Sequence, residues 1–246
     1  MNNSSRSVMR EAFVLLRSTV FWVFFAGSTV LYGASLWLLA PLPYRRRFAV
    51  ILTWSRLNVW VLEKVCGVSY CVEGRHNLPE GAAIAVANHQ STWETLALSF
   101  ILPPQSWVLK KQLMRIPFFG WGLAMAKPIA IDRSSGQSAR EQVIEQGTAR
   151  LREGLWVVIF PEGTRVAPGE VKRFKPGGAI LAEASGYPVV PIAHNAGLLW
   201  PRHQFRKYPG RITVRIGPAI DPAGLSRDEI NRRAETWIRR QLRDLL

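Results

Sequence analysis

From residue 67 onward, the chain alternates short apolar runs with stretches of helical periodicity. The apolar runs are rich in Val, Ile and Trp, as expected of strands that are buried on both faces. They cover residues 68–72, 83–87, 107–109, 128–131, 156–160, 189–193 and 212–216. Alternation of this kind favours an α/β sandwich. We therefore predict a mixed, largely parallel sheet of about seven strands flanked by helices.

Two of the helical stretches carry sequence signals for their ends. Residues 139–153 have Ser138 and Glu141 at the spacing of a capping box, and Gly154 follows as a stop signal. Residues 227–245 have Ser226 and Glu229 at the same spacing. The second stretch also carries an apolar stripe, which predicts that it packs on the core. The stripe consists of Ile230, Ala234, Trp237, Ile238 and Leu242.

The N-terminal part contains a long apolar segment. No charged residue lies between Arg17 and Arg45, and residues 18–40 are long enough to cross a bilayer as a helix. Both flanks are basic, so the distribution of positive charge does not define an orientation. Two arrangements stay open: a full membrane crossing, or a hairpin half-buried in one leaflet, with Gly27 and Gly33 allowing a bend or close packing.

A second, amphipathic stretch follows at residues 45–65. Its apolar residues, including Trp54 and Trp60, alternate with polar ones, which predicts a helix in the plane of the membrane interface. The alternative is that the two N-terminal helices form a pair within the protein core. We divide the chain into membrane-anchoring helices at residues 1–66 and a catalytic domain at residues 67–246.

Composition narrows the choice of partner. The net charge of +15, with the excess at both ends, is typical of proteins that bind nucleic acid or an anionic membrane. Most Trp residues lie in apolar runs and not on an exposed face, so we expect a lipid surface and no nucleic acid. Cys66 and Cys71 match no metal spacing and predict no disulfide, and His76, His194 and His203 have no visible partner.

The first candidate loop, residues 88–94, follows an apolar strand. His89 would act as a general base if the carboxylate of Glu94 held its ring in one tautomer. Five residues along a regular helix turn the chain by about 140°, so the two side chains meet only if His89 precedes the helix. The alternative is an ordinary capping box, in which Glu94 bonds to the backbone of Ser91.

The second candidate loop, residues 160–165, also follows an apolar strand. Within it, Glu162 and Gly163 are followed by the hydroxyl of Thr164 and by Arg165, whose planar guanidinium matches a phosphate or a carboxylate. Lys110 ends another strand and would add positive charge at the same edge of the sheet. The alternatives are an ordinary turn for the loop and a solvated position for Lys110.

Together, these segments resemble the 1-acylglycerol-3-phosphate acyltransferase family. The family's first block, an Asn-His pair with an acidic residue five positions after the His, is similar to residues 88–94, and its third, Phe-Pro-Glu-Gly-Thr-Arg, to residues 160–165. Its second block resembles residues 110–113 and 116–121, closing at Ile131-Asp132-Arg133, and its fourth resembles residues 189–192. The blocks occur in the family's order. One departure is Glu94, because the family more often has Asp there.

The resemblance implies transfer of a fatty acyl group from acyl-CoA or acyl carrier protein to the 2-hydroxyl of lysophosphatidic acid. His89 would take the proton, Glu94 would orient the imidazole, and Arg165 with Lys110 would hold the phosphate. Glu162, Gly163 and Thr164 would complete the substrate-binding loop, and no metal or cofactor is implied. The resemblance also implies a bacterial-type inner membrane location, with the catalytic domain on the cytoplasmic side.

Two other functions remain compatible with the residues. The same chemistry would serve another acceptor, such as a lyso-ornithine lipid. A basic membrane-binding module without catalysis would also use the charged ends and the apolar segment.

Overall fold

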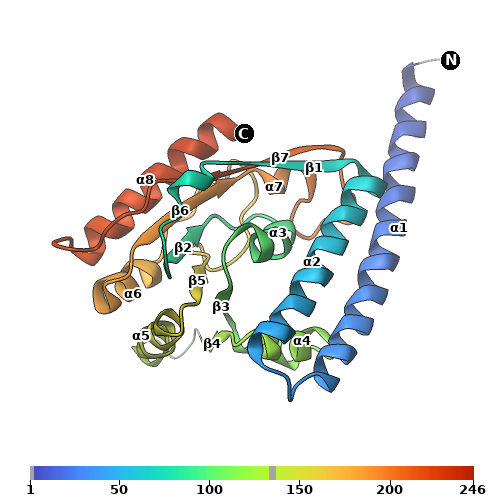
Figure 1. Ribbon diagram of the computed structural model, residues 1–246. Helices are drawn as coiled ribbons and strands as arrows, with labels where there is room; N and C mark the ends of the chain where they lie inside the picture. Colours follow the sequence, from blue (N-terminus) through green and yellow to red (C-terminus); the bar gives the residue numbers. More distant parts are fainter. Residues whose placement is uncertain (1–2, 133–136) are drawn as a thin grey trace.

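A computed structural model describes residues 3–132 and 137–246, and seven strands in these ranges form one mixed sheet (Figure 1). The strand order is β1-β7-β6-β2-β5-β3-β4, and every pairing is parallel except that of β6 with β7. The strands are β1 Val68–Glu73, β2 Ile84–Ala87, β3 Gln105–Lys110, β4 Ile129–Ile131, β5 Trp156–Ile159, β6 Val189–His194 and β7 Gly210–Ile216. All seven predicted strands are therefore confirmed, with ends that differ by at most a few residues.

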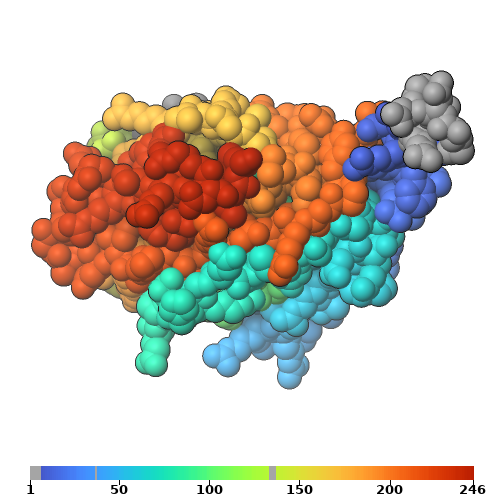
Figure 2. Space-filling view, turned by 90° about the horizontal axis from the view of Figure 1, so that it is seen from above, coloured from blue at the N-terminus to red at the C-terminus, as the bar shows by residue number. Residues whose placement is uncertain are grey.

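The helices cover both faces of the sheet. One face is covered by α5 (Gln137–Arg152), α6 (Gly177–Ser185) and α8 (Arg227–Leu245), whose apolar side chains form one core with the strands. On the other face, α2 (Tyr44–Cys66) and α3 (Trp93–Ile101) form a second core, which α1 (Asn3–Leu38) joins. The shorter elements are α4 (Phe119–Met125), α7 (Ala196–Leu199) and the 3-10 turns η1 (Arg75–Asn77) and η2 (Lys111–Arg115). Seen from above, α8 in red and the part of α1 drawn in blue lie on opposite sides of the molecule (Figure 2).

The predicted helix caps had different outcomes. The cap of α8 is confirmed, because the Ser226 hydroxyl accepts a hydrogen bond from the backbone N–H of Glu229. The cap predicted at Ser138 is wrong, because α5 begins at Gln137 and Ser138 lies inside the first turn, where its hydroxyl accepts a hydrogen bond from Gln142. The stop predicted at Gly154 agrees with the structure. The helix α5 ends at Arg152, and Gly154, two residues later, has a φ of 78°.

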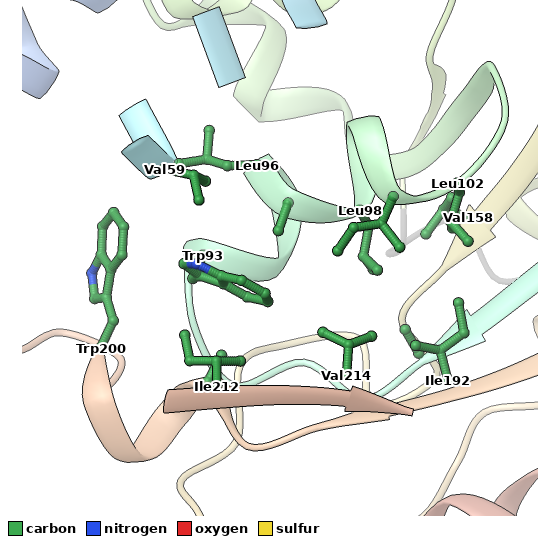
Figure 3. Close-up of a cluster of buried hydrophobic side chains, with 14 of the residues drawn as sticks. Val59, Trp93, Leu96, Leu98, Leu102, Val158, Ile192, Trp200, Ile212 and Val214 are labelled. Atoms are coloured by element: carbon green, nitrogen blue, oxygen red, sulfur yellow. The ribbon is translucent and has the colours of Figure 1, made fainter. Parts of the chain in front are cut away.

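The packing of α3 fixes the place where the first candidate loop ends. Trp93 and Leu98 point from α3 toward Ile212 and Val214 of β7 (Figure 3), and all four side chains are completely buried. Burial of large apolar side chains stabilises a fold by roughly 1.5–3 kcal/mol each, so the start of α3 is held firmly over the sheet.

The first helix has one packed side and one apolar outer side. Residues Ser7–Leu36 of α1 form the single helix in the described ranges that is long and apolar enough to cross a membrane, with a mean hydropathy of 1.6. Phe21 is buried against the domain, and a Cβ on Gly33 would overlap the backbone of Phe118. Many large apolar side chains elsewhere on α1 are exposed, among them Phe13, Leu16, Val23 and Leu31. This outer side supports association with a membrane.

The second helix does not lie as predicted. Phe48, Val59 and Leu62 of α2 are buried inside the protein, and of its large apolar residues Trp60 is exposed. The physical reason is that α2 lies between α1 and α3, so its apolar face is already covered. A polar contact also joins the first two helices, since the Ser28 hydroxyl donates to the side-chain oxygen of the buried Asn58.

A buried lysine ties α1 to the segment between α7 and β7. The backbone N–H of Lys207 donates to the Ser18 hydroxyl on α1, and its ammonium donates to the carbonyl of Phe205 at 2.7 Å. The ammonium also lies over the rings of Trp22 and Trp200, at 4.6 and 4.9 Å from their centroids. Burial lowers the pKa of Lys207 to about 8. These contacts join the apolar helix firmly to the sheet domain.

Candidate active site

The two candidate loops meet because they follow neighbouring strands. β2 and β5 are parallel and buried at every position, so their carboxyl ends lie at the same edge of the sheet. Two backbone contacts join the loops: the N–H of His89 donates to Oε1 of Glu162 at 3.2 Å, and the N–H of Val166 donates to the carbonyl of His89 at 2.8 Å. The structure therefore brings His89 and the Glu162–Arg165 segment together in one site.

His89 and Glu94 form a direct contact. The helix α3 begins at Trp93, so His89 lies on the loop before it, as the contact requires. Nδ1 of His89 lies 2.8 Å from Oε1 of Glu94, and the same oxygen accepts the backbone N–H groups of Gln90 and Ser91 at 2.9 and 2.8 Å. The geometry fits both interpretations of Glu94, because one carboxylate oxygen contacts the imidazole and also accepts the backbone N–H of Ser91 before the helix.

The surroundings keep Glu94 ionised. The carboxyl group is completely buried, and burial alone raises its pKa, but the hydrogen bonds that it accepts from His89 and from the backbone of Ser91 outweigh this effect. The net result is a pKa below the usual range. A carboxylate beside Nδ1 favours the tautomer with the proton on Nδ1 and a free lone pair on Nε2, on a side chain that is 15% exposed. This is the tautomer that a general base needs.

An aromatic ring fixes the plane of the imidazole. The ring of Phe160 stacks on His89 with centroids 4.0 Å apart and an angle of 10° between the planes, and Trp107 packs behind it at 5.7 Å. The sequence places Phe160 at the end of a strand and at the start of the third family block, but gives it no role. Its role was missed because stacking depends on how two parallel strands lie side by side.

Buried polar side chains join the first candidate loop to the end of β6 and to α7. The Asn88 side chain exchanges two hydrogen bonds with the backbone of His194, at 3.0 and 2.9 Å, and Nε2 of His194 contacts the Asn88 carbonyl at 2.7 Å. Next to it, the Gln90 side chain accepts the N–H of Gly197. Burial lowers the pKa of His194, so its ring is neutral. His194 therefore has a partner after all, and its role is structural.

Glu162 is a buried acid at the base of the site. Burial raises the pKa of its carboxyl group to about 7, and the nearby Glu94 carboxylate adds to this effect. Its Oε2 atom is buried and has no hydrogen-bond partner among the described residues. The family resemblance implies that Glu162 belongs to the substrate-binding loop, and in the structure its carboxyl group accepts a hydrogen bond from the backbone of His89.

The remaining candidate residues differ in how close they lie to this pair. Gly163 turns the second loop with a φ of 72°. Arg165 is partly buried and directly precedes Val166, whose N–H donates to the carbonyl of His89. The Thr164 hydroxyl makes no hydrogen bond within the described ranges. Lys110 is exposed at the end of β3, on the same edge of the sheet, and its side chain forms no hydrogen bond or ion pair with a described residue. Arg133, the last residue of the second sequence block, lies outside the described residues.

A buried carboxylate, an imidazole and the guanidinium of Arg165 can together remove a proton from an alcohol and hold an anion. The match to a family model gives the class of the protein: it is an acyltransferase. The chain belongs to the acyltransferase family, whose sequence model matches residues 69–195.

Similar proteins carry a more specific name. A 1-acyl-sn-glycerol-3-phosphate acyltransferase of Pseudomonas aeruginosa is 45% identical over 228 residues, which cover 91% of this chain and 89% of that protein. One of Saccharomyces cerevisiae is 32% identical and covers 98% of this chain and 80% of its own length. The crystal structure of the 1-acyl-sn-glycerophosphate acyltransferase PlsC of Thermotoga maritima matches 96% of this chain and 97% of its own, with a TM-score of 0.80 and 25% identity.

Proposed function

We propose that the protein transfers an acyl group to the 2-hydroxyl of 1-acyl-sn-glycerol-3-phosphate and so forms phosphatidic acid. The proposal is supported by the shared name of the relatives, which match over most of the chain. The observation that carries it is the 2.8 Å contact between Nδ1 of His89 and Oε1 of Glu94, beside a partly buried Arg165.

The reaction follows from the free nitrogen of the imidazole. Nε2 of His89 accepts the proton of the 2-hydroxyl as the hydroxyl oxygen attacks the carbonyl carbon of an acyl thioester. The tetrahedral intermediate then loses the thiolate, which takes the proton back from the imidazolium and leaves as the thiol. No side chain forms a bond to the acyl group. The thioester is that of acyl-CoA or of acyl carrier protein.

Each further residue has a role in this scheme. Glu94 stabilises the imidazolium that forms in the transition state and keeps the ring in one tautomer. Arg165 holds the phosphate of the acceptor by a charge-assisted pair of hydrogen bonds, and Lys110 adds positive charge at the same edge. Backbone N–H groups of the second loop, or Lys110, stabilise the oxyanion of the intermediate.

The apolar outer side of α1 has a purpose in this reaction. The acceptor carries one acyl chain and the product carries two, and exposing an acyl chain to water costs about 0.8 kcal/mol per methylene. With α1 as the anchor, residues 67–246 form the catalytic domain at the membrane surface. The basic ends of the chain favour an anionic surface, which is the cytoplasmic side of a bacterial inner membrane.

The test of this function is an acceptor comparison with the purified full chain in anionic vesicles. Lysophosphatidic acid, a lyso-ornithine lipid and other lyso-lipids are supplied in turn with one acyl-CoA, and the products are identified by mass spectrometry. We expect phosphatidic acid to form fastest. Faster acylation of lyso-ornithine lipid would reassign the acceptor, and no acylation of any lyso-lipid by acyl-CoA or acyl carrier protein would contradict the proposed function.

A further inference from the structure

A second guanidinium lies beside Arg165 and comes from a distant part of the chain. Arg202 follows α7, and its Nη1 atom donates a hydrogen bond to the backbone carbonyl of Arg165. Both side chains are partly buried. None of the sequence blocks discussed above contains Arg202, and nothing in the spacing of the sequence connects it with the second loop.

These two positive charges lack a counter-ion. Within the described ranges, neither Arg165 nor Arg202 forms an ion pair with a carboxylate, although most other arginines with partly buried side chains do so. Nε of Arg165 is buried and makes no hydrogen bond to a described residue. Burial lowers the pKa of Arg165, the positive charge of Arg202 adds to this effect, and the more distant Glu94 carboxylate opposes it.

Such an arrangement is unfavourable unless an anion completes it. Desolvating a guanidinium weakens the fold, and placing a second one beside it adds repulsion. A phosphate monoester carries up to two negative charges and several acceptor oxygens, which match two guanidinium groups with free N–H donors. In the acceptor of the proposed function, the phosphate is on the carbon next to the one that carries the reactive hydroxyl.

We propose that Arg202 binds the phosphate of the acceptor lipid together with Arg165, as a second cationic ligand. This inference rests on the proposed function and extends it to a residue outside the four sequence blocks. Arg165 directly precedes Val166, whose N–H bonds to the carbonyl of His89, so a phosphate held here lies on the loop that contacts the base.

The segment that carries Arg202 is also fixed to the apolar helix. Nε1 of Trp22 on α1 donates to the carbonyl of Phe205 at 2.9 Å. The backbone N–H of Lys207, in the same segment, donates to the Ser18 hydroxyl on α1. Arg202 is therefore held on the side of the site next to α1, where a lipid acceptor would enter from the membrane.

The experiment compares Arg202→Gln with Arg206→Gln in anionic vesicles, using the purified full chain. Arg206 lies on the same segment and pairs with Glu11 at 3.3 Å, so its loss removes the same charge without touching Arg165. We measure kcat and KM for lysophosphatidic acid, KM for the acyl thioester, and the rate with 1-acylglycerol, which lacks the phosphate. Arg202→Lys keeps the charge and gives a second reading if the Gln variant does not fold.

For Arg202→Gln, we expect KM for lysophosphatidic acid to rise about 10- to 100-fold with little change in kcat. The rate with 1-acylglycerol, KM for the thioester and all constants of Arg206→Gln should stay at wild-type values. Arg202→Lys should show an intermediate rise in KM, because a single ammonium cannot form the paired contact.

Three results would overturn the inference. An unchanged KM for lysophosphatidic acid in Arg202→Gln and in Arg202→Lys would show that Arg202 binds no phosphate. Equal losses with both acceptors would show that Arg202 only positions the second loop. A rise confined to KM for the thioester would assign the phosphate to the donor. Failure of the proposed function looks different, because the wild-type chain would then not acylate lysophosphatidic acid.

Discussion

Replacing Glu94 by Gln removes the negative charge beneath His89 while leaving the size of the side chain almost unchanged. The carboxylate is completely buried and its Oε1 atom accepts hydrogen bonds from His89 and from two backbone N–H groups. The amide oxygen of Gln can still accept the backbone donors, so we expect the variant to fold. The same oxygen also faces Nδ1 of His89 and can still accept its proton, but it carries no negative charge to stabilise the imidazolium.

The size of the effect follows from the contact distance. Two unit charges 2.8 Å apart attract by about 6 kcal/mol at an effective dielectric constant of about 20. The charges are both present only when the imidazole has taken the proton, so this attraction belongs to the transition state. Partial charge transfer and solvent near the exposed edge of the ring leave about half of it, or ~3 kcal/mol, which corresponds to about 100-fold in rate. We therefore expect kcat to fall about 10²-fold.

The assay measures initial rates with saturating acceptor and donor, with thermal unfolding as the control for folding. KM should change little, because the lost interaction acts mainly in the transition state. Glu94→Asp is the matched variant, because it keeps the negative charge and is shorter by one methylene. It should retain more activity than Glu94→Gln. A kcat for Glu94→Gln within about threefold of wild type would refute the reasoning.

Two further predictions concern stability. Gly33→Ala places a Cβ against the backbone of Phe118 and should lower the free energy of unfolding by about 1–3 kcal/mol. Gly27→Ala, on the same helix with nothing nearby, should be neutral or slightly stabilising, so equal melting temperatures for both variants in detergent would contradict this packing. At Glu162, the folded chain holds a proton up to a pKa of about 7, whereas the unfolded chain releases it near the usual 4.5. Wild-type stability should therefore fall as pH rises from about 5 to 8, by up to ~3 kcal/mol, and Glu162→Gln should lack this part of the slope in denaturant unfolding at both pH values. Identical slopes in the two proteins would show that the carboxyl group is not protonated in the folded state.

The strands and the sheet type were predictable because they depend on local signals. Buried strands such as β2 and β5 consist of consecutive apolar residues, and their order along the chain with intervening helices implies parallel pairing. The contact of His89 with Glu94 was predictable for a similar reason. It depends only on the helix beginning between His89 and Glu94, which are five positions apart.

The features that were missed depend on contacts between distant segments. Phe160 stacks on His89 only because two strands are neighbours, and Arg202 meets Arg165 across 37 residues of sequence. The amphipathic pattern of α2 was read as membrane-facing, since periodicity shows which side is apolar but does not show what covers it. In the structure, α1 and α3 cover that side.

The role of His89 as the base is tested most directly by the rate of acyl transfer in His89→Ala. Purified wild-type and variant chains are bound to anionic vesicles that contain lysophosphatidic acid, and formation of phosphatidic acid is followed after addition of the thioester. We predict that the variant binds the vesicles as well as wild type and loses at least about 10³-fold in kcat. Retention of wild-type activity by His89→Ala would contradict the mechanism.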